Sequence, residues 1–316
     1  MESSVSLSTR GTTTTPRRRP AVALCVLAAA VVTALSPVLV GLGTVPAAAA
    51  GWWHPALGNQ PWQWELSHPL DLSNPTDMGT QDTLPDGGPA PAPVIYDIDG
   101  IINPAATVSA LHALGAKVVC YVEVGAAGNY YSAAEEGLTT TYYRQLKAAG
   151  VMGHRVPHYP ERYLDVRSPD TVRIIETMIW QQCADKGFDA VETDIDEEYN
   201  DPSGFPLTQA DQESYMTTLA DFMHELGLAW WIKNPDDTGD SYATDMFPLA
   251  DAVLTEQCNQ YSTCGLLSAY ADKQAVFNAG ENAAEVPVKR VRNRDRRIAE
   301  AMDELDVRRF PSPLKE

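Results

Sequence analysis

The sequence predicts an α/β fold, a TIM-type (β/α)8 barrel with an irregular first connection and a closing segment that the pattern leaves undefined. Eight apolar runs have the length of strands, and most are apolar throughout, which is typical of parallel strands buried on both faces. Helix-like segments separate most of the runs, so successive strands should pair in parallel through right-handed crossovers. The alternative is a doubly wound open sheet, but no glycine-rich phosphate loop follows the first strands. The runs span residues 62–66, 93–99, 117–125, 162–166, 188–195, 228–234, 251–258 and 274–280.

The segments between the runs carry helix boundary signals. Residues 104–114 begin at a proline and end before Gly115, and residues 168–186 open with Ser-Pro-Asp and end before Gly187. Residues 208–226 begin with Thr-Gln-Ala-Asp, which is close to a capping box. Further helices are predicted at 139–149, 241–249 and 265–272. In contrast, the connection 67–92 has no helix pattern, and we expect it to form a lid or rim over the barrel mouth.

The two ends of the chain differ in composition from the rest. Residues 1–50 contain three consecutive arginines, an apolar stretch and the small residues of an Ala-x-Ala cleavage site, which together predict a secretory signal peptide. A retained membrane anchor is the alternative, since the stretch nearly has the length of a spanning helix. The predicted barrel domain then covers 51–288, and 289–316 form a basic C-terminal tail with nine basic and six acidic residues.

The predicted domain is strongly acidic. Residues 51–288 contain 10 lysines and arginines against 35 aspartates and glutamates. Such a charge repels nucleic acid and anionic lipid and attracts cationic ligands, although it also fits the solubility of a secreted protein. We therefore expect a secreted monomer with no nucleic-acid partner and no stable membrane insertion after signal cleavage.

Four cysteines remain outside the predicted signal peptide, and an exported chain uses such cysteines in disulfides. Three pairings are possible. The best supported is Cys258–Cys264, which closes a short loop after a strand, whereas Cys120 lies inside an apolar run and is also explained as a small buried side chain. No Cys-x-x-Cys pattern occurs, which argues against a structural zinc site.

Polar residues close most of the apolar runs, at the strand ends where barrels place their catalytic groups. Two carboxylates suffice for glycoside hydrolysis, one as nucleophile or base and one as acid, and crowding raises the pKa of some of them. Aromatic residues near the same ends, including Trp64, Tyr121 and Tyr199, are suited to stacking on sugar faces, although any one of them is more often core. The polar residues are Asp97, Asp99, Glu123, Asp165, Glu192, Asp194, Lys233, Asn234 and Glu256.

The stretch 187–199 holds six carboxylates in thirteen residues, and calcium binding is a rival explanation for it. An EF-hand loop starting at Asp194 is excluded because its sixth position is Tyr199 rather than glycine. A looser calcium site stays open as an alternative. We expect Asp196, Glu197 and Glu198 to lie beyond the strand in a solvated or substrate-facing loop. Ser–His–Asp hydrolysis is weakly supported, because no Gly-x-Ser-x-Gly elbow occurs.

Over about residues 52–278 the chain resembles glycoside hydrolase family 114, the endo-α-1,4-polygalactosaminidases. The resemblance rests on "WWHPALGNQPWQWEL", "YDIDG", "KVVCYVEVG", "YLDVRSP", "GFDAVETDIDEEYNDPSGFPLT", "WIKN" and "TEQCNQYSTC", in that order. It implies a (β/α)8 barrel that cleaves α-1,4-linked galactosamine polymers internally, without a metal or other cofactor. The chain departs from the family pattern at Thr193, Ile195 and Thr255, where the family has other residues beside the catalytic acids.

The resemblance also implies residue roles. Asp194 matches the nucleophile and Glu256 the general acid/base. Substrate binding is expected from Trp64, Asp97, Asp99, Tyr121, Glu123, Asp165, Glu192, Tyr199, Lys233 and Asn234. Two other classes of function stay open. One is a barrel that binds amino-sugar polymer without cleaving it, and the other is an exported acidic calcium-binding protein.

Overall fold

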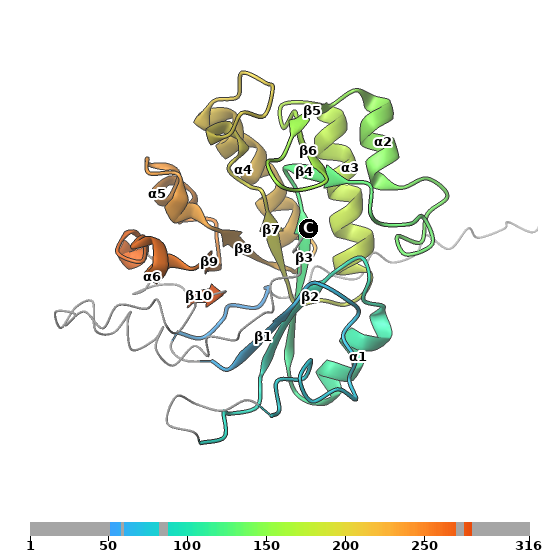
Figure 1. Ribbon diagram of the computed structural model, residues 1–316, viewed down its shortest axis with the longest axis vertical. Helices are drawn as coiled ribbons and strands as arrows, with labels where there is room; N and C mark the ends of the chain where they lie inside the picture. The colour runs from blue at the N-terminus through green and yellow to red at the C-terminus, as the bar shows by residue number, and fades with distance from the viewer. Residues whose placement is uncertain (1–50, 58–59, 82–87, 270–274, 280–316) are drawn as a thin grey trace, which may run out of the picture. The chain divides into compact units, whose positions relative to one another are not determined.

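The computed structural model describes residues 51–57, 60–81, 88–269 and 275–279. The predicted signal peptide and basic tail lie outside the described residues, as does the end of the predicted domain after residue 279. The main sheet is a nearly closed parallel barrel with helices on its outside (Figure 1). Its strands, in spatial order, are β1 (Trp62–Glu65), β2 (Ile95–Asp99), β3 (Lys117–Glu123), β7 (Ala190–Asp194), β8 (Ala229–Lys233), β9 (Ala252–Glu256) and β10 (Ala275–Ala279).

One predicted strand lies elsewhere. Residues 162–166 were expected in the barrel, but β6 (Glu161–Leu164) pairs antiparallel with β4 (Ala126–Gly128) and β5 (Met152–Arg155) in a separate sheet. The physical reason is that β3 pairs directly with β7, and Val124 N continues this pairing by donating to Asp194 O at 2.9 Å. The barrel prediction is confirmed, with seven parallel strands in the described part of the chain.

The four longest helices follow the predicted boundary signals, whereas the helix predicted at 265–272 is a 3₁₀ turn at Leu266–Ala269 in its described part. The Thr208 side chain accepts from Asp211 N while the Asp211 carboxylate accepts from Thr208 N, so the predicted capping box is present. Gly150 ends α2 in the left-handed conformation, with φ of 74°. The helices are α1 (Ala105–Ala113), α2 (Tyr142–Ala149), α3 (Pro169–Ile179), α4 (Gln209–Glu225), α5 (Tyr242–Met246) and α6 (Cys258–Tyr261). A π-helical turn (Trp180–Ala184) extends α3, and 3₁₀ turns occur at Glu198–Asn200, Pro235–Asp237 and Leu266–Ala269.

Strand residues alternate between two apolar layers, as period-2 geometry requires. Val119 of β3 and Trp231 of β8 pack inside the barrel. The preceding residues, Val118 and Trp230, pack outward against the helices. Inside, the Phe277 ring of β10 stacks on Trp231 with centroids 4.2 Å apart and meets the edge of Trp62 of β1 at 5.4 Å. These contacts join the first and last strands of the sheet through their side chains.

The connection after β1 is not a lid over the mouth in its described part. Leu70 and Met78 are buried in the layer outside the sheet, and the Tyr96 hydroxyl of β2 donates to Met78 O at 3.1 Å. Residues 67–81 therefore occupy the position of the helix that normally follows a barrel strand. The expectation of a lid or rim is wrong for this segment, because its apolar residues are buried against the outer face of β2 instead of lying over the barrel mouth.

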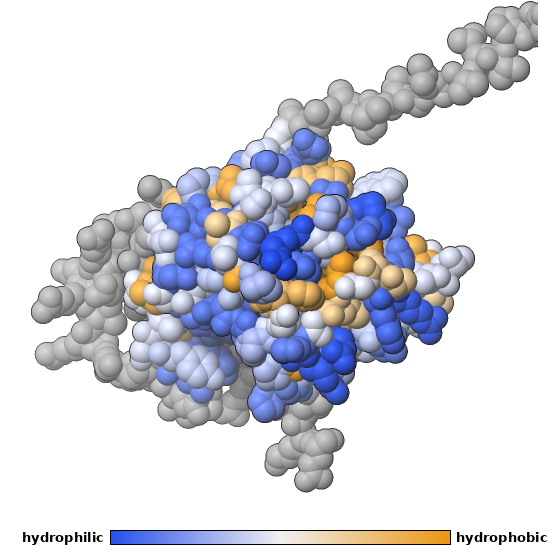
Figure 2. Space-filling view, turned by 90° about the horizontal axis from the view of Figure 1, so that it is seen from above, coloured by the Kyte–Doolittle hydropathy of each residue, from blue (hydrophilic) through white to orange (hydrophobic). Residues whose placement is uncertain are grey.

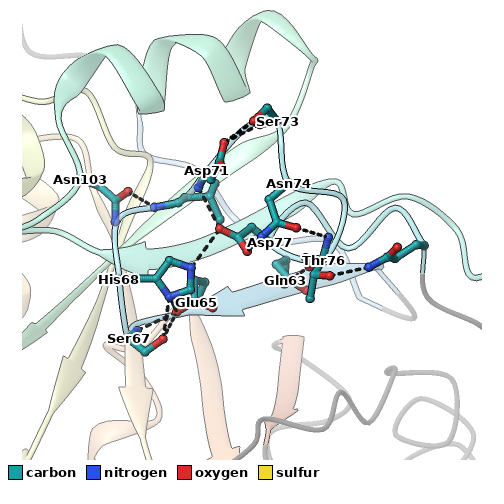
Figure 3. A network of polar contacts seen from close by, with 12 residues as sticks. Gln63, Glu65, Ser67, His68, Asp71, Ser73, Asn74, Thr76, Asp77 and Asn103 are labelled. Atoms are coloured by element: carbon teal, nitrogen blue, oxygen red, sulfur yellow. Dashed lines mark hydrogen bonds and ion pairs between the residues drawn. The ribbon is translucent and has the colours of Figure 1, made fainter. Parts of the chain in front are cut away.

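A polar network holds this connection in place (Figure 3). Asp77 is buried and accepts from Asp71 N at 2.9 Å and from Asn74 Nδ2 at 2.7 Å. His68 lies between two carboxylates, with Nε2 3.0 Å from Asp77 Oδ2 and Nδ1 3.2 Å from Glu65 Oε1. The network replaces regular backbone hydrogen bonding in a segment without helix or strand.

Two disulfides are present among the residues that the structure describes. Cys258–Cys264 closes the short loop as predicted. Cys120 of β3 pairs with Cys183 of the π-helical turn, which settles the pairing that the sequence left open. In the described part of the chain, no helix combines the length and apolarity that crossing a bilayer demands.

Candidate active site

Lys233 is the centre of a charged cluster inside the barrel. It ends β8 with its side chain pointing inward, and that side chain is only 5% exposed. Its Nζ lies 3.0 Å from Glu192 Oε1, 3.4 Å from Asp194 Oδ1 and 3.5 Å from Glu256 Oε2. Burial alone lowers the pKa of Lys233, but the charges of Asp194, Glu192 and Glu256 outweigh it and hold the pKa well above its usual value. The ammonium is therefore permanently charged near neutral pH.

Asp194 ends β7 and is held on both oxygens. Oδ2 accepts from the Tyr121 hydroxyl at 2.5 Å, and Oδ1 accepts from Ile195 N at 3.1 Å in addition to its contact with Lys233. Burial, followed by the charge of Asp194, raises the pKa of Tyr121 well above its usual value, so Tyr121 remains a donor. These contacts fix the orientation of the Asp194 carboxyl group.

Glu256 ends β9 and is clamped by Asn234. Asn234 Nδ2 donates to Glu256 Oε2 at 3.0 Å, and Glu256 N donates to Asn234 Oδ1 at 2.8 Å. The Glu256 side chain is 35% exposed, more than that of Asp194 at 23%. The Asn234 amide and the Lys233 ammonium both contact Oε2, so Oε1 is the oxygen of Glu256 that lies outside this clamp.

The residues after these three strand ends share an unusual backbone. Ile195, Asn234 and Gln257 follow Asp194, Lys233 and Glu256, and their φ values are 54°, 45° and 56°. The left-handed region suits asparagine but is strained for a β-branched residue such as isoleucine. Backbone strain is common at functional sites, where the chain must turn immediately after a catalytic side chain. Here it occurs at three adjacent strand ends.

A second layer of polar groups lies deeper in the barrel. Glu192 accepts from Trp64 Nε1 at 3.3 Å, and Lys233 lies over the Trp64 and Tyr121 rings at 5.0 and 5.2 Å from their centroids. Asp97 is fully buried, and burial together with the neighbouring Glu192 charge raises its pKa well above the usual value. Burial also raises the pKa of Glu192, and the charge of Lys233 counteracts that rise.

A second group of carboxylates lies beside Asp194, and two of its members were predicted. Asp99 accepts from the Tyr131 hydroxyl at 2.5 Å and from Ile101 N at 2.7 Å, and Glu123 accepts from the Tyr130 hydroxyl. Burial and then the Glu161 charge raise the pKa of Glu123 well above its usual value. Sequence reasoning missed Glu161 because it lies at the start of an apolar run rather than at its end.

Two predicted site residues make contacts outside the Lys233 cluster. Asp165 binds Arg167 through both oxygens, at 2.8 Å to Nε and 2.9 Å to Nη2. The reason is that the run containing Asp165 belongs to the separate antiparallel sheet and not to the barrel. The Tyr199 hydroxyl donates to Asp240 at 2.8 Å. The other predicted residues converge on Lys233 or lie beside Asp194.

The expectation of a solvated loop after β7 is wrong for two of its acids. Asp196 and Glu198 are fully buried. Asp196 Oδ2 accepts from Thr193 Oγ1 at 2.7 Å and from Lys233 N at 3.2 Å, and burial raises its pKa to about 7. The backbone of the next strand thus provides hydrogen bonds that the local sequence does not reveal.

Two departures from the family pattern have structural partners. Thr193 and Thr255 both turn outward from the barrel and donate to buried aspartates, Thr193 to Asp196 and Thr255 to Asp236 at 2.9 Å. Thr193 also accepts from Trp230 Nε1 at 2.9 Å. These threonines therefore stabilise the strand ends on the outer face of the barrel, away from the Lys233 cluster.

A parallel barrel that carries two oriented carboxylates at the ends of β7 and β9, on either side of β8, is the arrangement of a glycoside hydrolase. The view from above shows a face covered mostly by hydrophilic residues with short hydrophobic bands between them (Figure 2). A comparison with known families supports the same class of enzyme, because the model of glycoside-hydrolase family GH114 matches residues 43–291. The chain belongs to this family and is a glycoside hydrolase.

One solved structure supports the same fold, and a second match is weaker. The crystal structure of Aspergillus fumigatus Ega3 in complex with galactosamine matches with a TM-score of 0.57 and 27% identity, over 72% of this chain and 79% of that chain. The glycoside hydrolase domain of PelA from Pseudomonas aeruginosa matches with a TM-score of 0.47 and 13% identity, over 70% of this chain and 84% of that chain. The search of curated proteins found no significant match.

Proposed function

We propose that the protein is a secreted, endo-acting hydrolase of α-1,4-linked galactosamine-containing polysaccharide. The observation that carries the proposal is the convergence of Asp194 and Glu256 on one ammonium, that of Lys233, in a barrel of family GH114. The relative Ega3, whose structure contains galactosamine, supports an amino-sugar substrate. An acidic domain also favours a polymer that carries ammonium groups.

In this proposal Asp194 is the nucleophile and Glu256 the general acid/base. Asp194 attacks the anomeric carbon while Glu256 gives its proton to the departing glycosidic oxygen, and a covalent glycosyl ester forms. Glu256 then takes a proton from water, which attacks the same carbon and releases Asp194. Asn234 and Lys233 both bind Oε2 of Glu256, so we assign the proton exchange to Oε1.

The role assignment follows from how each carboxylate is held. Asp194 accepts hydrogen bonds on both oxygens and contacts Lys233, and these contacts hold it in one fixed orientation, as a nucleophile needs. Glu256 is the more exposed of the two and has one oxygen outside its clamp, as an acid that exchanges protons with solvent requires. Secretion is supported by the two disulfides.

The experiment is a reducing-end assay on α-1,4-linked galactosamine polymers of graded acetylation, with product lengths followed over time. Endo-cleavage predicts that long polymer disappears early and oligomers of many lengths appear. Release of monosaccharide alone would overturn the endo assignment. Binding of polymer without any release of reducing ends would overturn the hydrolase assignment and favour a non-catalytic binding barrel.

A further inference from the structure

Asp236 is a buried carboxylate close to the proposed general acid/base, and the proposed mechanism does not use it. It lies in the 3₁₀ turn Pro235–Asp237 and is 3% exposed. Among the described residues, its carboxylate has one hydrogen-bond donor, the Thr255 hydroxyl, which lies 2.9 Å from Oδ1 and 3.2 Å from Oδ2. Because a buried carboxylate without any donor is costly, the position of this turn depends on Thr255.

Thr255 and Glu256 are consecutive residues of β9, so their side chains point to opposite faces of the barrel wall. Leu254 packs inside the barrel and Val253 packs outside it, and the same alternation places Thr255 outside and Glu256 inside. Asp236 therefore meets β9 on the face opposite to the charged cluster. It can affect the reaction only through residues that it holds in place.

The residue that clamps Glu256 directly precedes the turn that contains Asp236. Asn234 Nδ2 donates to Glu256 Oε2 at 3.0 Å, and Asn234 Oδ1 accepts from Glu256 N at 2.8 Å. Asn234 and Asp236 thus bind two consecutive residues of β9, one on each face of the strand. Because only Pro235 separates them and its ring fixes φ, a movement of Asp236 is transmitted to Asn234.

Thr255 is one of the positions at which the chain departs from the family pattern. Thr193 is another, and it makes the same kind of contact, since its hydroxyl donates to the buried Asp196 at 2.7 Å. A threonine–aspartate pair therefore lies on the outer face of each of the two strands that carry the proposed catalytic carboxylates. The recurrence indicates that these pairs serve the strand ends rather than one loop alone.

We propose that Thr255 and Asp236 position Glu256, the proposed general acid/base, by fixing the turn that follows Asn234. The inference rests on the proposed function and adds two positioning residues to it, neither of which touches substrate. Without the Thr255 hydroxyl, Asp236 moves towards water, and the turn draws Asn234 away from Glu256 Oε2. The Glu256 carboxyl group then meets the glycosidic oxygen in the wrong orientation, and protonation of the leaving group slows.

The experiment compares Thr255→Val with the wild-type protein on two α-1,4-linked galactosamine oligosaccharides that differ in the group that leaves. One releases a sugar, which must be protonated to leave, and the other releases dinitrophenolate, which leaves without an acid. We expect kcat/KM to fall about 10- to 100-fold for the sugar leaving group and to change less than about 2-fold for dinitrophenolate. For the dinitrophenyl glycoside, kcat and KM should fall together, because Glu256 is also the base that activates water in the second step.

Three further variants separate positioning from stability. Thr255→Ser keeps the hydroxyl and should restore most of kcat/KM for the sugar leaving group. Thr171→Val is the matched control, because Thr171 is also fully buried and its hydroxyl donates to Asp165 O at 2.8 Å, away from the Lys233 cluster. Its kcat/KM should stay within about 2-fold on both substrates. The double variant Asp236→Ala, Thr255→Val should be no slower than Asp236→Ala, and a further loss would overturn the role of Asp236.

Equal losses of Thr255→Val on both leaving groups, or a loss on neither, would overturn the positioning role. If the wild-type protein cleaves neither substrate, the proposed hydrolase function fails, and a spectroscopic readout still decides the inference. The carbon-13 NMR signal of the Glu256 carboxyl group, identified by its absence in Glu256→Gln, should move in Thr255→Val and return in Thr255→Ser. An unchanged signal in Thr255→Val would show that Thr255 does not position Glu256.

Discussion

Asn234 and Glu256 exchange two hydrogen bonds, one from the Asn234 amide to the Glu256 carboxylate and one from the Glu256 backbone to the Asn234 carbonyl. The pair joins the ends of β8 and β9 at the mouth of the barrel. Asn234 also has a left-handed φ of 45°, a conformation that asparagine tolerates better than most residues. Asn234 thus suits the left-handed backbone turn, and its side chain also orients Glu256, the proposed general acid/base.

This relationship predicts the effect of Asn234→Gly. Glycine retains the left-handed backbone and removes only the amide, so the fold should be preserved while Glu256 loses its orientation. We expect kcat to fall about 10- to 100-fold with a small change in KM. Steady-state kinetics beside a thermal melt checks this, and an unchanged kcat would mean that Asn234 does not position Glu256.

Lys233→Met should destabilise the protein strongly. The substitution leaves Glu192, Asp194 and Glu256 without their shared cation, and breaking a buried ion pair costs ~3–5 kcal/mol. The matched control is Lys117→Met, because Lys117 also pairs with an aspartate, Asp189, but is 45% exposed. The control should cost less than ~1 kcal/mol. Urea denaturation of both variants measures the difference, and equal costs would contradict a central role for Lys233.

Gly125→Ala should disturb the loop after the nucleophile. A Cβ at Gly125 would lie 1.9 Å from Ile195 O and 2.3 Å from Glu198 Oε1, and the first of these is rigid backbone. We expect a loss of about 3 kcal/mol and a lower kcat, because Ile195 follows Asp194 directly. Gly265→Ala, where a Cβ meets no atom within 4 Å, should change stability by less than about 1 kcal/mol. Similar melting temperatures for both variants would show that the approach of Gly125 to Ile195 is not required.

Stability should decrease as the pH rises from about 5 to 8. The pKa values of Glu161 and Asp196 are raised to about 7 in the folded protein, so the folded state binds more protons than the unfolded state over this range. The free energy of unfolding therefore falls with rising pH. Chemical denaturation at several pH values tests the sign, and Glu161→Gln should make the slope shallower. A stability that rises over this window would contradict the raised pKa values of Glu161 and Asp196 in the folded protein.

Much of the site follows from strand periodicity. Tyr121, Glu192, Asp194, Lys233 and Glu256 lie at the ends of apolar runs in positions that face inward, and a parallel barrel brings such ends together. The sequence therefore predicts both the fold and the Lys233 cluster. The order of the strands in space also follows, apart from the run at 162–166.

What the sequence does not predict depends on long-range contacts. The run at 162–166 has the composition of a barrel strand, but its pairing partners are two short segments that have no strand pattern of their own. That is why Asp165 was expected in the site and Glu161 was not. The burial of Asp196 is likewise supplied by the backbone of Lys233, which is distant in sequence.

The most direct test of the central claim is the turnover of Asp194→Asn and Glu256→Gln on deacetylated α-1,4-galactosamine polymer. Both substitutions are isosteric, so the fold should persist in each. Removal of a catalytic carboxylate predicts a loss of kcat of about 10³-fold or more for each variant, with polymer binding retained. If either variant kept most of the wild-type kcat, Asp194 and Glu256 would not be the catalytic pair.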